Sequence, residues 1–176
     1  MNKPHTGLVE VFTGNGKGKT SAALGVVLRA AGQGLRSHIV YFMKGDFPYG
    51  EQKVLSRLPN VSFARFGFER FCDPDHITEE EREQARLALA EAQRAMLSGH
   101  FDLVVLDEVN VASAWGLIPA EEVLKLLDQR PPGVELILTG RYADDRLIQR
   151  ADLVTEMVEV KHPFRHGIKS RPGIDF

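Results

Sequence analysis

The stretch FTGNGKGKTSAALG, residues 12–25, lies directly after a short apolar run and directly before an alanine-rich segment. Its three alternate glycines allow the backbone N–H groups to turn inward as a nest for an anion. A helix that begins near Lys19 adds the positive end of its dipole, Lys19 adds a mobile cation, and Thr20 adds a hydroxyl suited to Mg²⁺. The stretch therefore predicts a phosphate-binding loop, in preference to a flexible glycine turn.

The loop departs from the strict pattern G-x-x-x-x-G-K-[ST] at its first position, where this chain has Thr13. Thr13 can end the strand, because Gly14 supplies the permissive backbone turn one residue later. The candidate nucleotide-binding residues are the loop, the residue after it and one later arginine: Thr13, Gly14, Asn15, Gly16, Lys17, Gly18, Lys19, Thr20, Ser21 and Arg141.

Length and composition predict one globular domain, residues 1–176, with a short arm at 1–6 and a tail at 161–176. A formal net charge of -2 gives no field that favours nucleic acid or an anionic membrane, so neither is expected as a partner. The single cysteine, Cys72, excludes an internal disulfide and fits a reducing compartment. No apolar run has the length of a signal peptide or a membrane helix, and we expect a cytoplasmic protein.

Strand-like and helical patterns alternate along the whole chain. Apolar β-rich runs occupy 7–13, 37–43, 61–66, 101–108, 134–140 and 153–160. Helical patterns occupy 19–34, 51–58, 78–99, 119–130 and 144–151. Thr78 and Glu81 form a capping box at the start of the longest helix. This order predicts an α/β fold, a mostly parallel sheet with helices on both faces.

Ligands of such folds bind beyond the carboxyl ends of the strands. The segments that follow the strands are 13–20, 44–51, 67–77, 107–116 and 140–145. The fourth of them begins with Asp107 and Glu108, at the end of a nearly continuous apolar run. A solvated acidic pair would be the plain interpretation, but a phosphate loop in the same chain favours Mg²⁺ held by Thr20, Asp107 and Glu108. Lys19 and Glu108 are the catalytic candidates, with one carboxylate free to act as a base.

Other charged residues are less decisive. Arg141, at the end of LTGR, is either a phosphate contact or a surface arginine, and Lys44 in FMKG is a candidate second phosphate or substrate contact. The histidines lack the spacing of metal ligands, and no G-x-S-x-G motif is present.

Several blocks together resemble one known family. They are FTGNGKGKTSAALG, FMKG, GF at 67–68, LVVLDEVNVA, ELILTGR, ADLVTEM, VKHPF and the closing GIKSRPGIDF. In order and spacing they are similar to the P-loop corrinoid adenosyltransferases, from about residue 7 to the C-terminus. The resemblance implies a P-loop NTPase-like, RecA-like fold, usually a homodimer. It also implies transfer of the 5′-deoxyadenosyl group of ATP to the Co(I) centre of a reduced corrinoid, with release of triphosphate.

The resemblance also carries roles onto particular residues. It implies that Gly14 through Thr20 cradle the triphosphate, that Thr20 and Glu108 bind Mg²⁺, and that Phe68 helps to displace the lower axial ligand of the corrinoid. Many members read GFTW where this chain reads GFER, so Arg70 stands in the place of a tryptophan. Phe71 is the candidate to fill that gap, and a flavoprotein is the expected reductant of the corrinoid.

Two other functions remain open from the loop alone. One is a conventional P-loop ATPase or small-molecule kinase, in which Glu108 orients or deprotonates the group that attacks the γ-phosphorus. The other is a non-catalytic nucleotide-binding regulator, for which the chain offers no extra module. A guanine-specific GTPase is disfavoured, because no N-K-x-D segment follows the strands.

Overall fold

The computed structural model describes residues 6–47 and 49–176, which form a single sheet with helices on both sides. Within these residues the strands are β1 (Val9–Thr13), β2 (Ser37–Tyr41), β3 (Val61–Arg65), β4 (Leu103–Asp107), β5 (Glu135–Thr139) and β6 (Leu153–Glu156). The helices are α1 (Lys19–Gly32), α2 (Gly50–Leu55), α3 (Glu79–Leu97), α4 (Val109–Ala114), α5 (Ala120–Asp128) and α6 (Asp145–Arg150), with a 3₁₀ turn at Pro163–His166. Most of the predicted arm, 1–5, lies outside the described residues.

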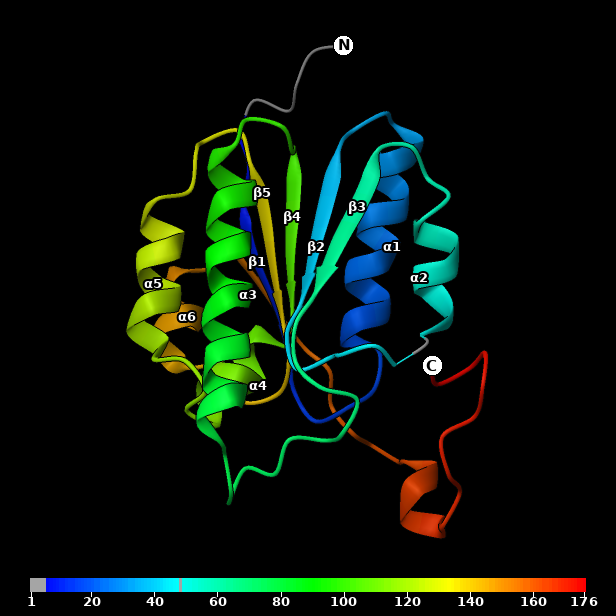
Figure 1. Ribbon diagram of the computed structural model, residues 1–176. Coiled ribbons are helices and arrows are strands. Elements are labelled where there is room, and N and C mark those ends of the chain that lie inside the picture. Colours follow the sequence, from blue (N-terminus) through cyan, green and yellow to red (C-terminus); the bar gives the residue numbers. More distant parts are fainter. Residues whose placement is uncertain (1–5, 48) are drawn as a thin grey trace.

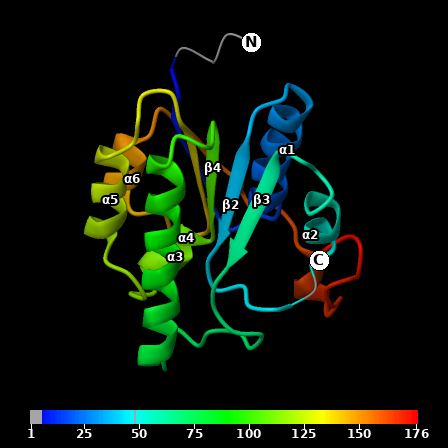
Figure 2. The same cartoon turned by 45° about the horizontal axis from the view of Figure 1, so that its top comes forward.

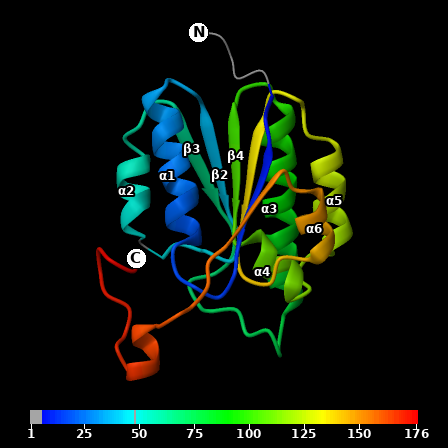
Figure 3. The ribbon, with the colours of Figure 1, turned by 180° about the vertical axis from the view of Figure 1, so that it is seen from behind.

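The strand order is β3-β2-β4-β5-β1-β6, and every neighbouring pair is parallel. Helices α1 and α2 cover one face, whereas α3, α4, α5 and α6 cover the other (Figures 1 and 3). The predicted α/β class with helices on both faces is confirmed, and the sheet is parallel throughout. β5 lies between the strand of the phosphate loop, β1, and the strand of the acidic pair, β4.

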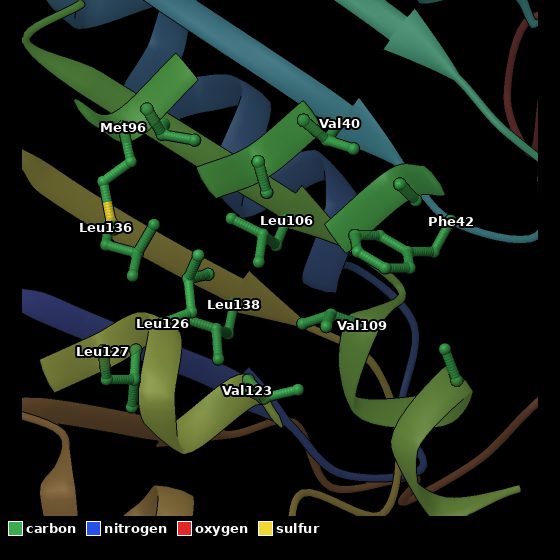
Figure 4. Close-up of a cluster of buried hydrophobic side chains, with 14 of the residues drawn as sticks. Val40, Phe42, Met96, Leu106, Val109, Val123, Leu126, Leu127, Leu136 and Leu138 are labelled. Atoms are coloured by element: carbon green, nitrogen blue, oxygen red, sulfur yellow. The ribbon is translucent and has the colours of Figure 1, made fainter. Parts of the chain in front are cut away.

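The larger core lies between the sheet and the second group of helices (Figure 4). Every residue of β4 is buried, which explains why that run is apolar almost without interruption. Leu136 and Leu138 of β5 point from the sheet toward Leu126 of α5, and all three are almost fully buried. Each such side chain contributes ~1.5–3 kcal/mol by leaving water, so this core fixes the positions of the strand ends.

Helix α3 begins where its sequence predicts. The Thr78 hydroxyl accepts from the Glu81 N–H at 3.2 Å, and Glu81 Oε2 accepts from the Thr78 N–H at 2.9 Å, which completes the capping box. On the face of α3 that packs against the core, Ala85 and Met96 are buried, and Leu89 is partly buried. The helix therefore presents a fixed N-terminus to the segment that precedes it, residues 67–77.

Two local features differ from the predicted elements. The six-residue helix α4 follows Glu108 directly and was not predicted, because it is too short to show a helical period in the sequence. Strand β6 ends at Glu156, four residues before the end of the predicted run at 153–160. All its residues are exposed, since it forms the edge of the sheet.

The carboxyl ends of the strands lie together at one edge of the sheet (Figures 1 and 2). The phosphate loop, the 67–77 segment and the C-terminal tail gather at that edge, so residues far apart in sequence lie near one another there (Figure 1). Among the helices of the described chain, none combines the length and the apolarity needed to span a membrane.

Candidate nucleotide and metal site

The phosphate loop is held in a conformation that its glycines allow. Gly14 and Gly18 adopt φ values of 93° and 117°, which L side chains rarely tolerate. A Cβ atom on Gly16 would lie 2.7 Å from the carbonyl oxygen of Met157, the same oxygen that accepts a hydrogen bond from the Gly16 N–H at 2.6 Å. Thr13 ends β1, and its hydroxyl accepts from the Ala143 N–H at 3.2 Å. The loop therefore rests on the segment after β6.

Lys19 begins α1 and turns back over the loop. Its Nζ donates to the carbonyl oxygens of Gly14 at 2.8 Å and Gly16 at 2.6 Å. Burial lowers the pKa of Lys19, while the nearby carboxylate of Glu108 acts in the opposite direction. The two hydrogen bonds thus hold the ammonium group of Lys19 against the backbone of the loop.

Asp107 is the centre of a buried hydrogen-bond network and is 1% exposed. Its Oδ1 accepts from the hydroxyls of Thr20 at 2.8 Å and Thr139 at 2.7 Å, and its Oδ2 accepts from Lys44. The network joins the ends of β4 and β5 to the first turn of α1. Lys44 was predicted as a phosphate or substrate contact, and in the structure its ammonium group binds Asp107.

Thr139 was not singled out from the sequence, although it stands beside the predicted Arg141 in LTGR. Its hydroxyl both donates to Asp107 and accepts from the Glu108 N–H at 3.0 Å. The sequence signal that could have identified it is a hydroxyl side chain at the last position of a buried strand, next to a candidate metal site. The position of β5 between β1 and β4, which the sequence does not reveal, explains its role.

Glu108 has a backbone φ of 66°, a left-handed conformation for a residue other than glycine. This turn ends β4, starts α4 and places the side chain on the wall of the cleft. Burial raises the pKa of Glu108, as does Asp107, while Lys44, Lys19 and Arg141 lower it. The net effect is a pKa above the ordinary value, because the three cations offset only part of the cost of burial.

A cleft of about 470 Å³ at this edge brings most of the predicted site residues together. Those that line it are Gly16, Lys17, Gly18, Lys19, Thr20, Ser21, Lys44, Phe71, Glu108 and Arg141. Trp115, Tyr142 and His162 also line it and were not predicted. Thr13, Gly14 and Asp107 support the cleft from behind, and Asn15 is exposed on the loop.

Phe68 and Arg70 lie apart from Phe71. The guanidinium of Arg70 is 5.3 Å from the centre of the Phe68 ring and 3.5 Å from Glu81 Oε1, so both residues are tied to the start of α3. They line a small cavity of about 20 Å³, whereas Phe71 is 99% exposed and faces the cleft of the phosphate loop.

The C-terminal tail reaches the phosphate loop, which the sequence did not indicate. Lys17 forms an ion pair with Asp175 and donates to the Ile174 carbonyl at 3.0 Å. The contact with Lys17 lowers the pKa of Asp175, and Phe176 packs edge to face on Phe47. The tail thereby becomes one wall of a second cleft, of about 830 Å³, beside α1 and α2.

The donor groups suit Mg²⁺ that is shared with a nucleotide. In the described part of the chain no group of three or more His, Cys, Asp and Glu side chains is arranged to hold a metal ion. Mg²⁺ in nucleotide sites usually takes one or two protein oxygens and completes its shell with water and phosphates. The Thr20 hydroxyl and the Glu108 carboxylate, on the wall of one cleft, fit that requirement.

A glycine loop between a parallel strand and a helix, with an acidic residue on a non-adjacent strand bound to the loop threonine, defines a P-loop α/β protein. Within that class, the chain belongs to the ATP:corrinoid adenosyltransferase family (BtuR/CobO/CobP), whose model matches residues 5–176. Corrinoid adenosyltransferases from Escherichia coli K12 and Pseudomonas aeruginosa are 37% and 38% identical to the chain. The alignments cover 97% of this chain and 86% and 84% of those proteins. Corrinoid adenosyltransferase CobA of Salmonella typhimurium is 36% identical over 97% of the chain and 86% of its own length.

Proposed function

We propose that the protein transfers the 5′-deoxyadenosyl group of ATP to the cobalt of a reduced corrinoid, in cobalamin synthesis or salvage. The observation that carries the proposal is the cleft itself, in which the phosphate-loop residues Lys19 and Thr20 share a wall with Glu108 and the exposed Phe71. The family to which the chain belongs supports the same reaction.

The residues present suit a reaction that needs positioning more than proton transfer. Co(I) is itself a strong nucleophile, so the Co–C5′ bond forms and the C5′–O5′ bond breaks without a general base. The electrons of the broken bond leave with triphosphate. Lys19, Lys17 and the start of α1 would hold the triphosphate through charge and N–H donors, and the closely fitted loop would fix its orientation.

The proposed metal site consists of Thr20 and Glu108, with Asp107 in a supporting position. Asp107 already accepts hydrogen bonds from Thr20, Thr139 and Lys44, so we propose that it orients the Thr20 hydroxyl. Mg²⁺ bound there would neutralise part of the negative charge that develops on the triphosphate. Arg141, on the wall of the same cleft, would add a forked cation to the phosphates.

Phe68, Arg70 and Phe71 are the proposed corrinoid contacts. The exposed Phe71 lines the cleft, and the guanidinium of Arg70 lies over the ring of Phe68. We propose that Phe68 helps to displace the lower axial ligand, and that the Arg70–Glu81 ion pair anchors the segment that carries Phe68.

The main alternative is a P-loop ATPase or kinase that uses Glu108 as a base. The two functions break different bonds of ATP, so the phosphate product separates them. Incubation with ATP, Mg²⁺ and chemically reduced cob(I)alamin should yield adenosylcobalamin and triphosphate in equal amounts. ADP and phosphate formed at the same rate without corrinoid would instead establish the hydrolase.

The partners follow from the same proposal. We propose a cytoplasmic homodimer that receives its corrinoid from a flavoprotein reductant. Sedimentation equilibrium should give twice the monomer mass of 19.6 kDa. A mass of one chain at micromolar concentration would exclude the dimer without affecting the proposed chemistry.

A further inference from the structure

The sequence predicted Lys44 as a phosphate or substrate contact, and the proposed reaction assigns it no role, although it lines the same cleft as Lys19 and Thr20. It follows β2 by three residues, directly after Met43, whose φ is 58°. Its Nζ forms an ion pair with Asp107 Oδ2 and lies 5.0 Å from the ring centre of Tyr49 and 5.3 Å from that of Tyr41. Aromatic faces attract a cation, so three neighbours hold the ammonium group in one place.

The backbone fixes Lys44 as firmly as its side chain does. The Lys44 N–H donates to the Phe66 carbonyl at 2.9 Å, and the Gly45 N–H donates to the Phe68 carbonyl at 3.3 Å. The Lys44 side chain is 12% exposed. A lysine held at both ends is poorly suited to swing toward a ligand, but well suited to hold a neighbouring side chain in place.

Asp107 is that neighbour, and it depends on Lys44 for charge balance. Among the described residues, Lys44 is the cation within ion-pair distance of this almost fully buried carboxylate. Without Lys44, the negative charge of Asp107 would be uncompensated in the interior, beside the site of a polyanion.

We propose that Lys44 is a positioning residue of the nucleotide site, which acts through Asp107 and makes no direct contact with the phosphates. With Oδ2 bound to Lys44, Oδ1 is presented to the hydroxyls of Thr20 and Thr139. The pair thereby sets the orientation of Thr20 and screens the triphosphate from a buried negative charge. The inference extends the proposed function, since it concerns how this site accepts ATP.

A double-mutant cycle tests the inference through ATP affinity, measured calorimetrically with Mg²⁺ and without corrinoid. Lys44→Met should weaken ATP binding by about tenfold or more, because it leaves Asp107 unpaired. In an Asp107→Asn background the same change should cost less than about threefold, because no charge remains to be balanced. If Lys44→Met costs as much in that background as in the native protein, Lys44 touches the phosphates itself and the proposal is wrong.

Lys17→Met is the matched control, because Lys17 lies in the same cleft but pairs with Asp175. Its effect on ATP affinity should be the same in both backgrounds.

If Lys44→Met does not fold, the ATP affinities of Asp107→Asn and of the double variant still test the proposal, because neither protein carries the unpaired carboxylate. If the double variant has the melting temperature of the native protein but still binds ATP as weakly as Lys44→Met, the role of Lys44 is purely structural. Native protein that binds ATP but makes no adenosylcorrinoid would overturn the proposed function alone.

Discussion

At the scale of single residues, the site is organised by side chains that bind one another and the backbone of the phosphate loop. Lys19 donates to two carbonyls of its own loop, and Asp107 accepts from Thr20, Thr139 and Lys44. Such contacts reduce the reorganisation needed when a charged substrate arrives. A substitution of Lys19 should therefore impair function more than it impairs stability.

Lys19→Ala tests this at the phosphate loop. We expect a loss of at least ~100-fold in kcat/KM for adenosyl transfer, because the cation nearest to the loop carbonyls is removed. The measurement is the rate of adenosylcorrinoid formation by absorbance. Lys125→Ala is the control, since Lys125 is an exposed lysine of α5 that pairs with Glu122. Activity near that of the control would mean that the loop does not hold the triphosphate.

Phe68→Ala tests the proposed corrinoid contact. The variant should lose more activity with cob(II)alamin and a reductase than with chemically prepared cob(I)alamin, because displacement of the lower ligand matters before reduction and not after it. Parallel assays with both substrates give the comparison. An equal loss on both would argue that the ring has only a packing role against Arg70.

At the scale of elements, helix α3 links the segment 67–77 to the core. Its N-terminal Glu81 both completes the capping box with Thr78 and pairs with Arg70, which in turn stacks on Phe68. The position of Phe68 thus depends on how firmly the first turn of α3 is formed. This dependence could not be predicted from the sequence, where Arg70 looked like the loss of a tryptophan.

Thr78→Ala measures the strength of that start. Loss of the cap should lower the free energy of unfolding by ~1 kcal/mol, because the Glu81 N–H loses its acceptor. Urea unfolding followed by circular dichroism gives the value, and Thr78→Ser, which keeps the hydroxyl, should cost less than half as much. If alanine and serine destabilise equally, the lost methyl group matters and the cap does not.

At the scale of the whole molecule, the sequence predicted the strand–helix alternation and the edge of the sheet that carries the site. It did so because β4 and β5 are buried runs and because α3 has a strong cap. The sequence did not reveal which strands are neighbours in the sheet. Thr139 joins Asp107 only because β5 lies between β1 and β4, and Asp175 meets Lys17 only because the tail returns to the loop. Single-sequence patterns report local periodicity, and these contacts join residues 32 and 158 positions apart.

Stability of the whole fold should depend on pH through Glu10 in β1. Burial and a hydrogen bond with Glu135 raise the pKa of Glu10 from 4.5 to about 7. A carboxyl whose pKa is higher in the folded state stabilises the fold when protonated, so its contribution is complete below pH 4.5 and disappears as the pH rises through about 7. The free energy of unfolding of Glu10→Gln relative to the native protein should therefore rise between pH 4.5 and 7. A difference independent of pH would show that Glu10 ionises normally.

The hydrogen bond between Gly16 and Met157 has a consequence for the order of events during synthesis. The glycine leaves the ribosome early, yet its supporting partner follows 141 residues later, which is roughly 7–28 s at the usual rates of translation. A nascent chain that ends before β6 carries the complete motif without the backbone that shapes it. The chain would then gain its affinity for nucleotide late in synthesis, and ATP would bind complete chains in preference to incomplete ones.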